Sequence, residues 1–185
     1  MNLAVLLYNE VADLDALGVY GVLGAAKPFL PEDTSSYTVA RSRMSVTTAG
    51  GLVVTPHWAF MSAPTPDVLV VPGGNLELVT KDRAVTAYLA EHAPRVRFCV
   101  AVGTGAFLLG ELGLVRDMDA TTWAGALERL RDYEVGCTID APVVKNPNGR
   151  WFAAGGAKGL QVGLELLREL FGEGVAEETR VRLEL

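Results

Sequence analysis

Short, nearly uncharged apolar runs alternate along this chain with segments whose apolar residues recur at helical spacing. The strand-like runs are Leu3–Tyr8, Tyr37–Arg41, Leu52–Thr55, Asp67–Val71 and Val96–Val102. The helix-like segments are Leu17–Leu23, Val85–Leu89, Phe107–Leu112, Trp123–Leu130 and Gly159–Phe171. Alternating strands and helices favour a parallel sheet with helices on both faces. We therefore predict an α/β fold, a flavodoxin-like three-layer sandwich with a mostly parallel central sheet.

Two glycine-rich loops follow buried strands of this predicted sheet. Pro72-Gly73-Gly74 follows the run that ends at Val71, and Gly103-Thr104-Gly105 follows the run that ends at Val102. Ligands of parallel sheets bind beyond the carboxyl ends of the strands. A sharp turn from strand to helix is also where many α/β enzymes hold a nucleophile above backbone N–H groups. Here residue 103 is glycine, so this turn has an enzyme-like setting without a reactive side chain.

Near the carboxyl end, a hairpin is predicted. Val143-Val144 and Trp151-Phe152 flank Asn146-Pro-Asn-Gly149, and Asn-Gly is a strong hairpin signal.

Composition narrows the possible class of protein. The chain has 185 residues, half of them apolar, and a formal net charge of −6, which is typical of one globular domain over 1–185. No Lys/Arg run is present, so neither nucleic acid nor an anionic membrane is an expected partner. Two cysteines are too few for a disulfide framework, and no signal peptide or membrane span is evident. We expect a cytoplasmic protein.

Four motifs in order resemble the ThiJ/PfpI superfamily, which includes the Parkinsonism-associated deglycase and isocyanide hydratases and has a glutamine-amidotransferase-like fold. The motifs are Asp67-Val-Leu-Val-Val-Pro-Gly-Gly74, Val102-Gly-Thr-Gly-Ala-Phe-Leu-Leu-Gly110, Gly113-Leu-Val-Arg-Asp-Met-Asp-Ala-Thr-Thr122 and Ala154-Gly-Gly-Ala-Lys-Gly-Leu-Gln161. Each is weak alone, but their order and spacing over nearly the whole chain make the resemblance specific. The isocyanide-hydratase branch is the most similar one.

The resemblance implies that three chemical groups of the family are replaced in this chain. The family's nucleophilic cysteine falls on Gly103, its histidine after Ala-Thr-Thr falls on Trp123, and a helix-borne aspartate falls on Gln161. In the family, the elbow cysteine has a strained backbone, and a glycine adopts that conformation freely. Two separate losses favour a natural departure over an engineered one.

Other groups of the family's pocket are retained. Asp15 lies on the loop where this branch has a carboxylate that hydrogen-bonds the thiol, Gly73 and Gly74 match the backbone donors of an oxyanion pocket, and Thr104 flanks the elbow. With Gly103 and Trp123, these residues form the predicted ligand-binding set. Asp15 is a possible base, although a helix cap or a solvated carboxylate is the simpler expectation. Trp123 could stack a planar ligand, but we expect it to fill the emptied site.

Neither cysteine is expected to replace the missing nucleophile. Cys99 lies four residues before Gly103 on the same strand, about 13 Å away along it. A buried apolar strand raises a thiol's pKa and keeps it inert. Cys137 reads as part of a partly buried strand. No spacing of histidines and cysteines suggests a metal site, and no cofactor is expected.

We therefore expect a family member without cysteine chemistry that binds a small molecule or acts as an accessory protein, and that forms a homodimer as the resemblance implies. One alternative is a hydratase or hydrolase in which Asp15 activates water for an isocyanide-like substrate. Another is a stand-alone ligand-sensing module related to regulator-associated domains.

Overall fold

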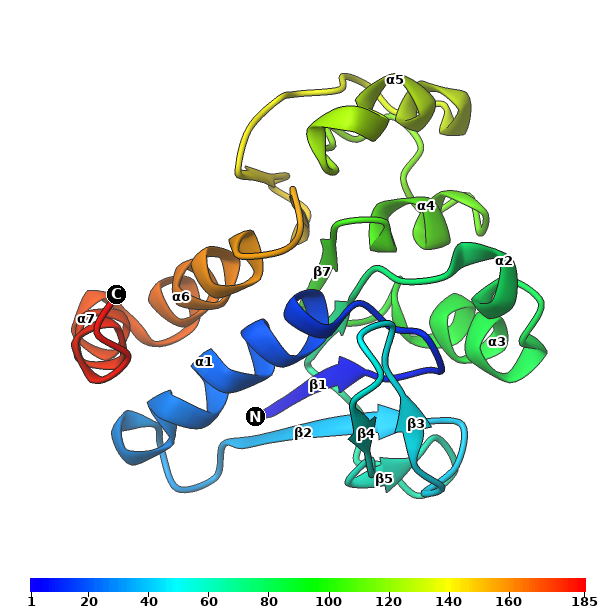
Figure 1. Ribbon diagram of the computed structural model, residues 1–185. Helices are drawn as coiled ribbons and strands as arrows, with labels where there is room; N and C mark the ends of the chain where they lie inside the picture. Colours follow the sequence, from blue (N-terminus) through cyan, green and yellow to red (C-terminus); the bar gives the residue numbers. More distant parts are fainter.

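Seven strands form the central sheet, in the order β5–β2–β1–β6–β7–β9–β8, in the computed structural model, which describes residues 1–185. The strands are β1 (Asn2–Leu6), β2 (Ser35–Ala40), β5 (Trp58–Ala59), β6 (Val68–Val71), β7 (Phe98–Val102), β8 (Val143–Lys145) and β9 (Arg150–Ala153). All neighbours pair in parallel except β8 and β9, which form an antiparallel hairpin. The predicted mostly parallel sheet is confirmed (Figure 1).

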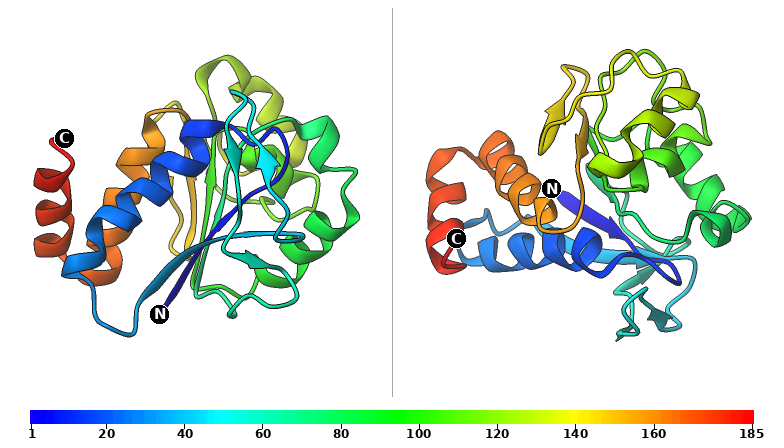
Figure 2. Two further views of the ribbon diagram at one scale, coloured as in Figure 1. Left: turned by 60° about the horizontal axis from the view of Figure 1, so that its bottom comes forward. Right: turned by 45° about the horizontal axis from the view of Figure 1, so that its top comes forward.

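Helices cover both faces of this sheet. Those longer than one turn are α1 (Val19–Ala26), α3 (Arg83–His92), α4 (Gly105–Gly110), α6 (Lys158–Phe171) and α7 (Glu173–Arg182), and the short ones are α2 (Leu76–Val79) and α5 (Leu127–Leu130). Figures 1 and 2 show α1, α6 and α7 together on one side and α2, α3 and α4 on the other. The three-layer α/β prediction is therefore confirmed. No helix is long and apolar enough to cross a bilayer.

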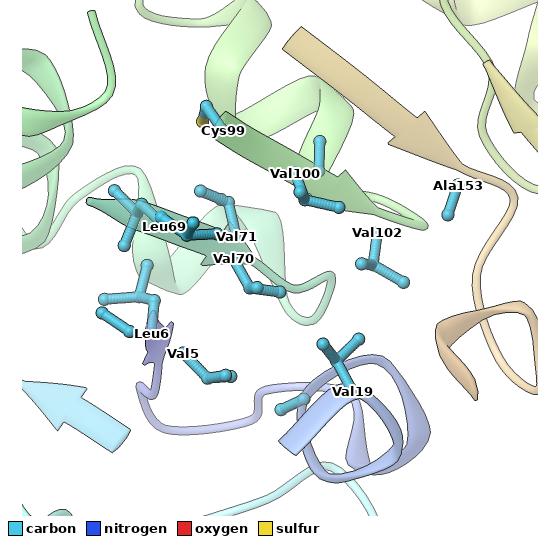
Figure 3. Close-up of a cluster of buried hydrophobic side chains, with 14 of the residues drawn as sticks. Val5, Leu6, Val19, Leu69, Val70, Val71, Cys99, Val100, Val102 and Ala153 are labelled. Atoms are coloured by element: carbon cyan, nitrogen blue, oxygen red, sulfur yellow. The ribbon is translucent and has the colours of Figure 1, made fainter. Parts of the chain in front are cut away.

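The core is built from the apolar runs that the sequence shows. Val5 of β1 pairs with Val70 of β6, and Val70 pairs with Val100 of β7, so branched side chains line up across neighbouring strands. Figure 3 shows Val5, Val70 and Val102 on the side that faces Val19 of α1, while Cys99 points to the opposite side. All of these side chains are buried, which explains why the strands carry no charge.

A turn of π-helix, Leu14–Gly18, leads from the loop after β1 into α1. Such turns are rare, and they occur often at functional sites because the extra residue redirects nearby side chains. Asp15 lies within this turn and is buried. The sequence predicts a helix that begins near Leu17, so the structure moves Asp15 from a loop into the helical segment.

Three sequence predictions differ from the structure. The predicted strand Leu52–Thr55 is only β4 (Val53–Val54), which pairs with β3 (Val46–Thr47) in a separate two-stranded sheet. The predicted helix Trp123–Leu130 is a 3-10 turn, Ala124–Ala126, followed by α5, because only Ala126 and Leu130 of this segment are buried. Cys137, expected in a partly buried strand, is exposed.

The topology brings the two glycine-rich loops together. β6 and β7 are neighbours in parallel register, with Val71 opposite Ala101, so the loops that follow them leave the same edge of the sheet. β9 pairs with β7 through Val102 and Ala153, which places the loop after β9 at the same edge. Residues far apart in sequence therefore meet around Gly103.

Candidate functional site

The turn between β7 and α4, which we call the elbow, is formed by Gly103 and Thr104. Gly103 has a φ of 56°, a left-handed conformation that costs residues with a Cβ about 1–2 kcal/mol and costs glycine little. Its N–H donates to the carbonyl of Ala153 at 2.9 Å, and its carbonyl accepts from Thr122 Oγ1 at 2.9 Å. The backbone conformation expected at this elbow is present, and both polar groups of Gly103 are bonded within the protein.

Asp15 is the ionisable side chain at the elbow. It is 5% exposed, its Oδ1 accepts from the Gly156 N–H at 2.6 Å, and its Oδ2 accepts from the Gly73 N–H at 3.2 Å. Burial raises the pKa of this carboxyl, while the two amide hydrogen bonds lower it by less. The expectation that Asp15 caps a helix or stays solvated was wrong, because the π-helical turn directs it inward onto two glycine amides.

The two loop glycines use their N–H groups on the protein itself. The Gly73 N–H donates to Asp15, and the Gly74 N–H donates to Thr104 Oγ1 at 2.9 Å. Thr104 Oγ1 in turn donates to the Gly74 carbonyl at 3.3 Å. The structure thus brings five of the six predicted ligand-binding residues together, and the groups expected to meet a ligand hydrogen-bond one another. We call Asp15, Gly73, Gly74, Gly103 and Thr104 the elbow cluster.

A side chain at residue 103 would require the Asp15 carboxylate to shift. A Cβ built on Gly103 would lie well inside 3.0 Å of Asp15 Oδ2, 3.3 Å from Asp15 Cγ and 3.4 Å from Gly155 Cα. A Cβ on Gly73 would lie 2.6 Å from both Asp15 Oδ2 and Thr104 Oγ1. The Asp15 carboxylate therefore occupies the space in which a residue 103 side chain would begin.

Trp123 lies apart from the elbow cluster. Its side chain is 53% exposed, and its ring packs over Gly125, where it would collide with any Cβ. The expectation that this ring fills the site beside Gly103 was wrong, because more than half of the Trp123 side chain is exposed and the Asp15 carboxylate lies beside Gly103. The neighbouring Thr122 contacts the elbow instead, and sequence reasoning did not single it out, although it belongs to the Ala-Thr-Thr motif.

Tyr8 and Gly156 also belong to the surroundings of the elbow and were not predicted as site residues. The buried Tyr8 hydroxyl donates to the Pro72 carbonyl at 2.8 Å, and the tyrosine pKa is raised by burial and by the Asp15 charge. A Cβ on Gly74 would lie 2.9 Å from Tyr8 Cε2. Tyr8 therefore forms the wall beside Gly74. The Gly155-Gly156 pair was visible in the sequence only as small residues before a helix.

The cysteines lie outside the elbow cluster. Cys99 is 1% exposed, and burial raises the pKa of its thiol to about 12, an effect that the nearby Arg150 charge reduces. The predicted position of Cys99 in a buried strand is confirmed. Both cysteines are free, and no group of three or more His, Cys, Asp or Glu side chains is placed to hold a metal ion.

Two pockets of the molecule are lined by residues outside the elbow cluster. One, of about 250 Å³, is lined by Cys99, Arg116 and Arg150 among others. The other, of about 650 Å³, is lined by residues from 7–9 after β1, from 40–46 after β2 and from 78–85 of α2 and α3. We call the second the strand-end pocket. It is at the carboxyl ends of β1 and β2, where parallel sheets bind ligands, and it shares Tyr8 as a wall with the elbow cluster.

Comparisons with known proteins agree with this architecture. A sequence model of the DJ-1/PfpI family matches residues 1–169. The isonitrile hydratase of Pseudomonas putida is 30% identical over 190 residues, which cover 100% of this chain and 78% of the hydratase.

Solved structures give the same result. A THiJ/PfpI family protein from Pseudomonas syringae superposes with a TM-score of 0.89 at 27% identity, over 99% of this chain and 74% of that one. Drosophila melanogaster DJ-1beta superposes with a TM-score of 0.85 at 16% identity, over 100% of this chain and 97% of that one, which concerns the fold alone.

Proposed function

The chain belongs to the DJ-1/PfpI family, and we propose that it acts as a small-molecule-binding or accessory protein without covalent cysteine chemistry. The elbow residue is Gly103, and the two cysteines of the chain are elsewhere, one buried in β7 and one exposed. Neither cysteine is therefore in a position to supply a thiolate at the elbow. The proposed protein therefore has the family's fold and acts without the family's cysteine nucleophile.

One observation carries this proposal. The Asp15 carboxylate occupies the space beside Gly103 and is held there by two amide hydrogen bonds. Those bonds, with the bond from Gly74 to Thr104, leave neither Gly73 nor Gly74 with an unused N–H. Stabilising a developing oxyanion needs donors aimed at the substrate. Here the donors already have protein acceptors, which favours binding elsewhere over chemistry at the elbow.

A second candidate is an enzyme in which Asp15 activates water. The raised pKa of this carboxyl favours it, because a stronger base accepts a proton more readily near neutral pH. Against it, Asp15 is 5% exposed and both of its oxygens already accept hydrogen bonds. The hydratase relative makes isonitriles the first substrates to try. A ligand-sensing module is a third candidate, and it shares the binding step of the leading proposal.

The test compares the natural chain with a Cys99→Ser, Cys137→Ser double variant and with Asp15→Asn. Each is incubated with an isonitrile, and the N-substituted formamide that hydration would yield is measured. In parallel, iodoacetamide adducts are followed by mass spectrometry of the folded protein. We expect no turnover above the uncatalysed rate and only slow alkylation, confined to the exposed Cys137.

Two results would reject the leading proposal. Turnover that disappears in the double-serine variant would establish cysteine chemistry. Turnover that survives in that variant but disappears in Asp15→Asn would establish the water-activating enzyme.

We also propose a homodimer. Leu14, Leu52 and Val53 are apolar side chains that are 55%, 50% and 65% exposed. Asp13 accepts hydrogen bonds from Thr48 Oγ1 and the Gly50 N–H, which joins the β3–β4 hairpin to the segment that begins α1. Exposed apolar side chains on joined segments favour association. Light scattering should give about twice the 19.7 kDa chain mass, and Val53→Glu should shift it toward one chain.

A further inference from the structure

The strand-end pocket has the size and lining of a small-ligand site. Its volume of about 650 Å³ falls in the range of small-molecule sites, which are concave, largely apolar and supplied with few polar groups. Eight of its 13 lining residues are hydrophobic. Its place beyond the carboxyl ends of β1 and β2 is where ligands of parallel sheets bind.

The pocket is next to the elbow cluster, and Tyr8 borders both. Tyr8 lines the pocket, while its hydroxyl is bonded to the Pro72 carbonyl and its ring edge lies against Gly74. Tyr8 is among the residues that line the pocket, and Asp15 is not. Binding at this site therefore needs no chemistry at the elbow.

The apolar part of the pocket is open for contact. Met44 and Leu78 are 78% and 48% exposed, and they line the pocket together with the buried Val46 and Val85. Methionine is flexible and polarisable, and it adapts to ligands of different shapes. An aliphatic chain laid between these side chains would cover apolar surface that water now contacts.

The charged part of the pocket is one ion pair. Arg41 Nη1 lies 3.2 Å from Asp82 Oδ2, and the other Asp82 oxygen accepts from the Ala84 N–H at 3.0 Å and the Val85 N–H at 3.4 Å at the start of α3. Asp82 is thus occupied on both oxygens. The Arg41 side chain is 67% exposed and makes one hydrogen bond, so most of its five N–H donors remain available.

From this arrangement we infer that the strand-end pocket binds a small organic carboxylate with an aliphatic body. The carboxylate would be held by the free N–H groups of Arg41, whose planar fork matches two carboxylate oxygens. The aliphatic body would lie against Met44, Leu78 and Tyr8. The inference rests on the proposed function, because it names the ligand class for a protein that binds without cysteine chemistry.

Three probes of equal chain length test the ligand class in the natural protein. Octanoate, octan-1-ol and octylammonium share an aliphatic body and differ in charge, and titration calorimetry measures each. We expect octanoate to bind at least about tenfold more tightly than the other two, as a hydrogen bond to a charged group contributes. Equal binding of all three, or tighter binding of octylammonium, would overturn the inference. Acetate at the same concentrations should bind far more weakly, and equal affinity for acetate would reject the aliphatic contact.

Two variants of the ion pair should then change the octanoate affinity in opposite directions. Arg41→Gln should weaken octanoate binding about tenfold and leave octan-1-ol unchanged. Asp82→Asn should strengthen octanoate binding severalfold, because it removes a repelling charge and a competing acceptor for Arg41 while it keeps an oxygen at the start of α3.

Arg43→Gln is the matched control, since Arg43 is an exposed arginine two residues away that does not line the pocket. Circular dichroism establishes that each variant is folded. An unchanged octanoate affinity in Arg41→Gln, or an equal loss in Arg43→Gln, would reject the site.

The experiments distinguish a failure of the carboxylate-binding inference from a failure of the proposed function. Cysteine-dependent turnover of an isonitrile would reject the proposed function and leave the octanoate preference standing. Loss of that preference would reject the ligand class alone.

Discussion

The elbow cluster and the strand-end pocket lie at the same edge of the sheet, on the two sides of Tyr8, and they use their polar groups in opposite ways. At the elbow, Asp15 and Thr104 accept the hydrogen bonds of Gly73, Gly74 and Gly156. In the pocket, Arg41 makes one hydrogen bond and is 67% exposed. A polar group can bind a ligand only where its donors are not already used. In the elbow cluster the hydrogen-bond donors are thus used by the protein itself, whereas in the strand-end pocket Arg41 keeps donors that a ligand can use.

The largest expected effect comes from adding one carbon at the elbow. Gly103→Ala should lower the free energy of unfolding by about 2–4 kcal/mol, because a left-handed residue with a Cβ costs about 1–2 kcal/mol and the displaced Asp15 loses hydrogen bonds. Urea denaturation followed by circular dichroism measures the change.

Gly21→Ala is the matched control for this substitution. Gly21 lies in α1 with nothing within 4 Å of an added Cβ, so the substitution should stabilise the helix by about 0.5–1 kcal/mol. A loss of less than 1 kcal/mol in Gly103→Ala would show that Asp15 yields easily and that the elbow is not closed.

The same crowding would determine the acidity of a cysteine introduced at residue 103. In Gly103→Cys the sulfur would share a buried space with the Asp15 carboxylate, and both the like charge and burial raise a thiol's pKa. We therefore expect a thiol pKa above the usual value of about 8.5, measured from the pH dependence of thiolate absorbance. A pKa well below that value would show that the elbow still supports thiolate chemistry.

Asp15→Asn tests the second largest effect, a loss of about 1–3 kcal/mol in unfolding free energy at acidic pH, since an amide NH₂ would face a backbone donor in a buried site. The folded pKa of Asp15 is raised above its ordinary value of 3.8. Its contribution to stability is therefore complete below that value and is lost as the pH rises through the folded pKa. The difference in unfolding free energy between natural chain and variant should shrink with rising pH. A difference that grows instead would mean that the two amide bonds outweigh burial.

Substitutions of Asp82, at the boundary of the pocket, should change the stability of the protein less. Its side chain caps α3, and Asp82→Ala should destabilise the protein by about 1 kcal/mol. Asp82→Asn retains the capping oxygen and should change the stability by only a few tenths of a kcal/mol. Thermal unfolding of both variants separates the capping role from the charge, and equal losses in the two would show that the ion pair with Arg41 stabilises the fold.

The smallest effect is expected inside the pocket. Leu78→Gln changes a side chain that is 48% exposed, so the free energy of unfolding should stay within about 0.5 kcal/mol of the natural value. Octanoate binding should nevertheless weaken. A large loss of stability would show that Leu78 belongs to the core and that the pocket is not open in solution.

The sequence by itself determined the sheet, the helices on both faces and the elbow. Uncharged runs such as Val68–Val71 and Phe98–Val102 must be buried on both faces, and the helical spacing of α3 and α6 leaves few other folds. It also placed Gly73, Gly74 and Gly103 at one edge, because parallel strands end together. These features depend on local periodicity, which a single chain displays directly.

Only the tertiary structure decided what the elbow contains. Asp15 and Gly156 are separated by 141 residues, and their hydrogen bond forms because the loops after β1 and β9 meet at the carboxyl end of β7. The exposure of Trp123 and the ion pair of Arg41 with Asp82 depend likewise on neighbours from distant segments. Periodicity shows which side chains are buried, whereas the identity of a hydrogen-bond partner depends on the packing of loops that carry no periodic signal.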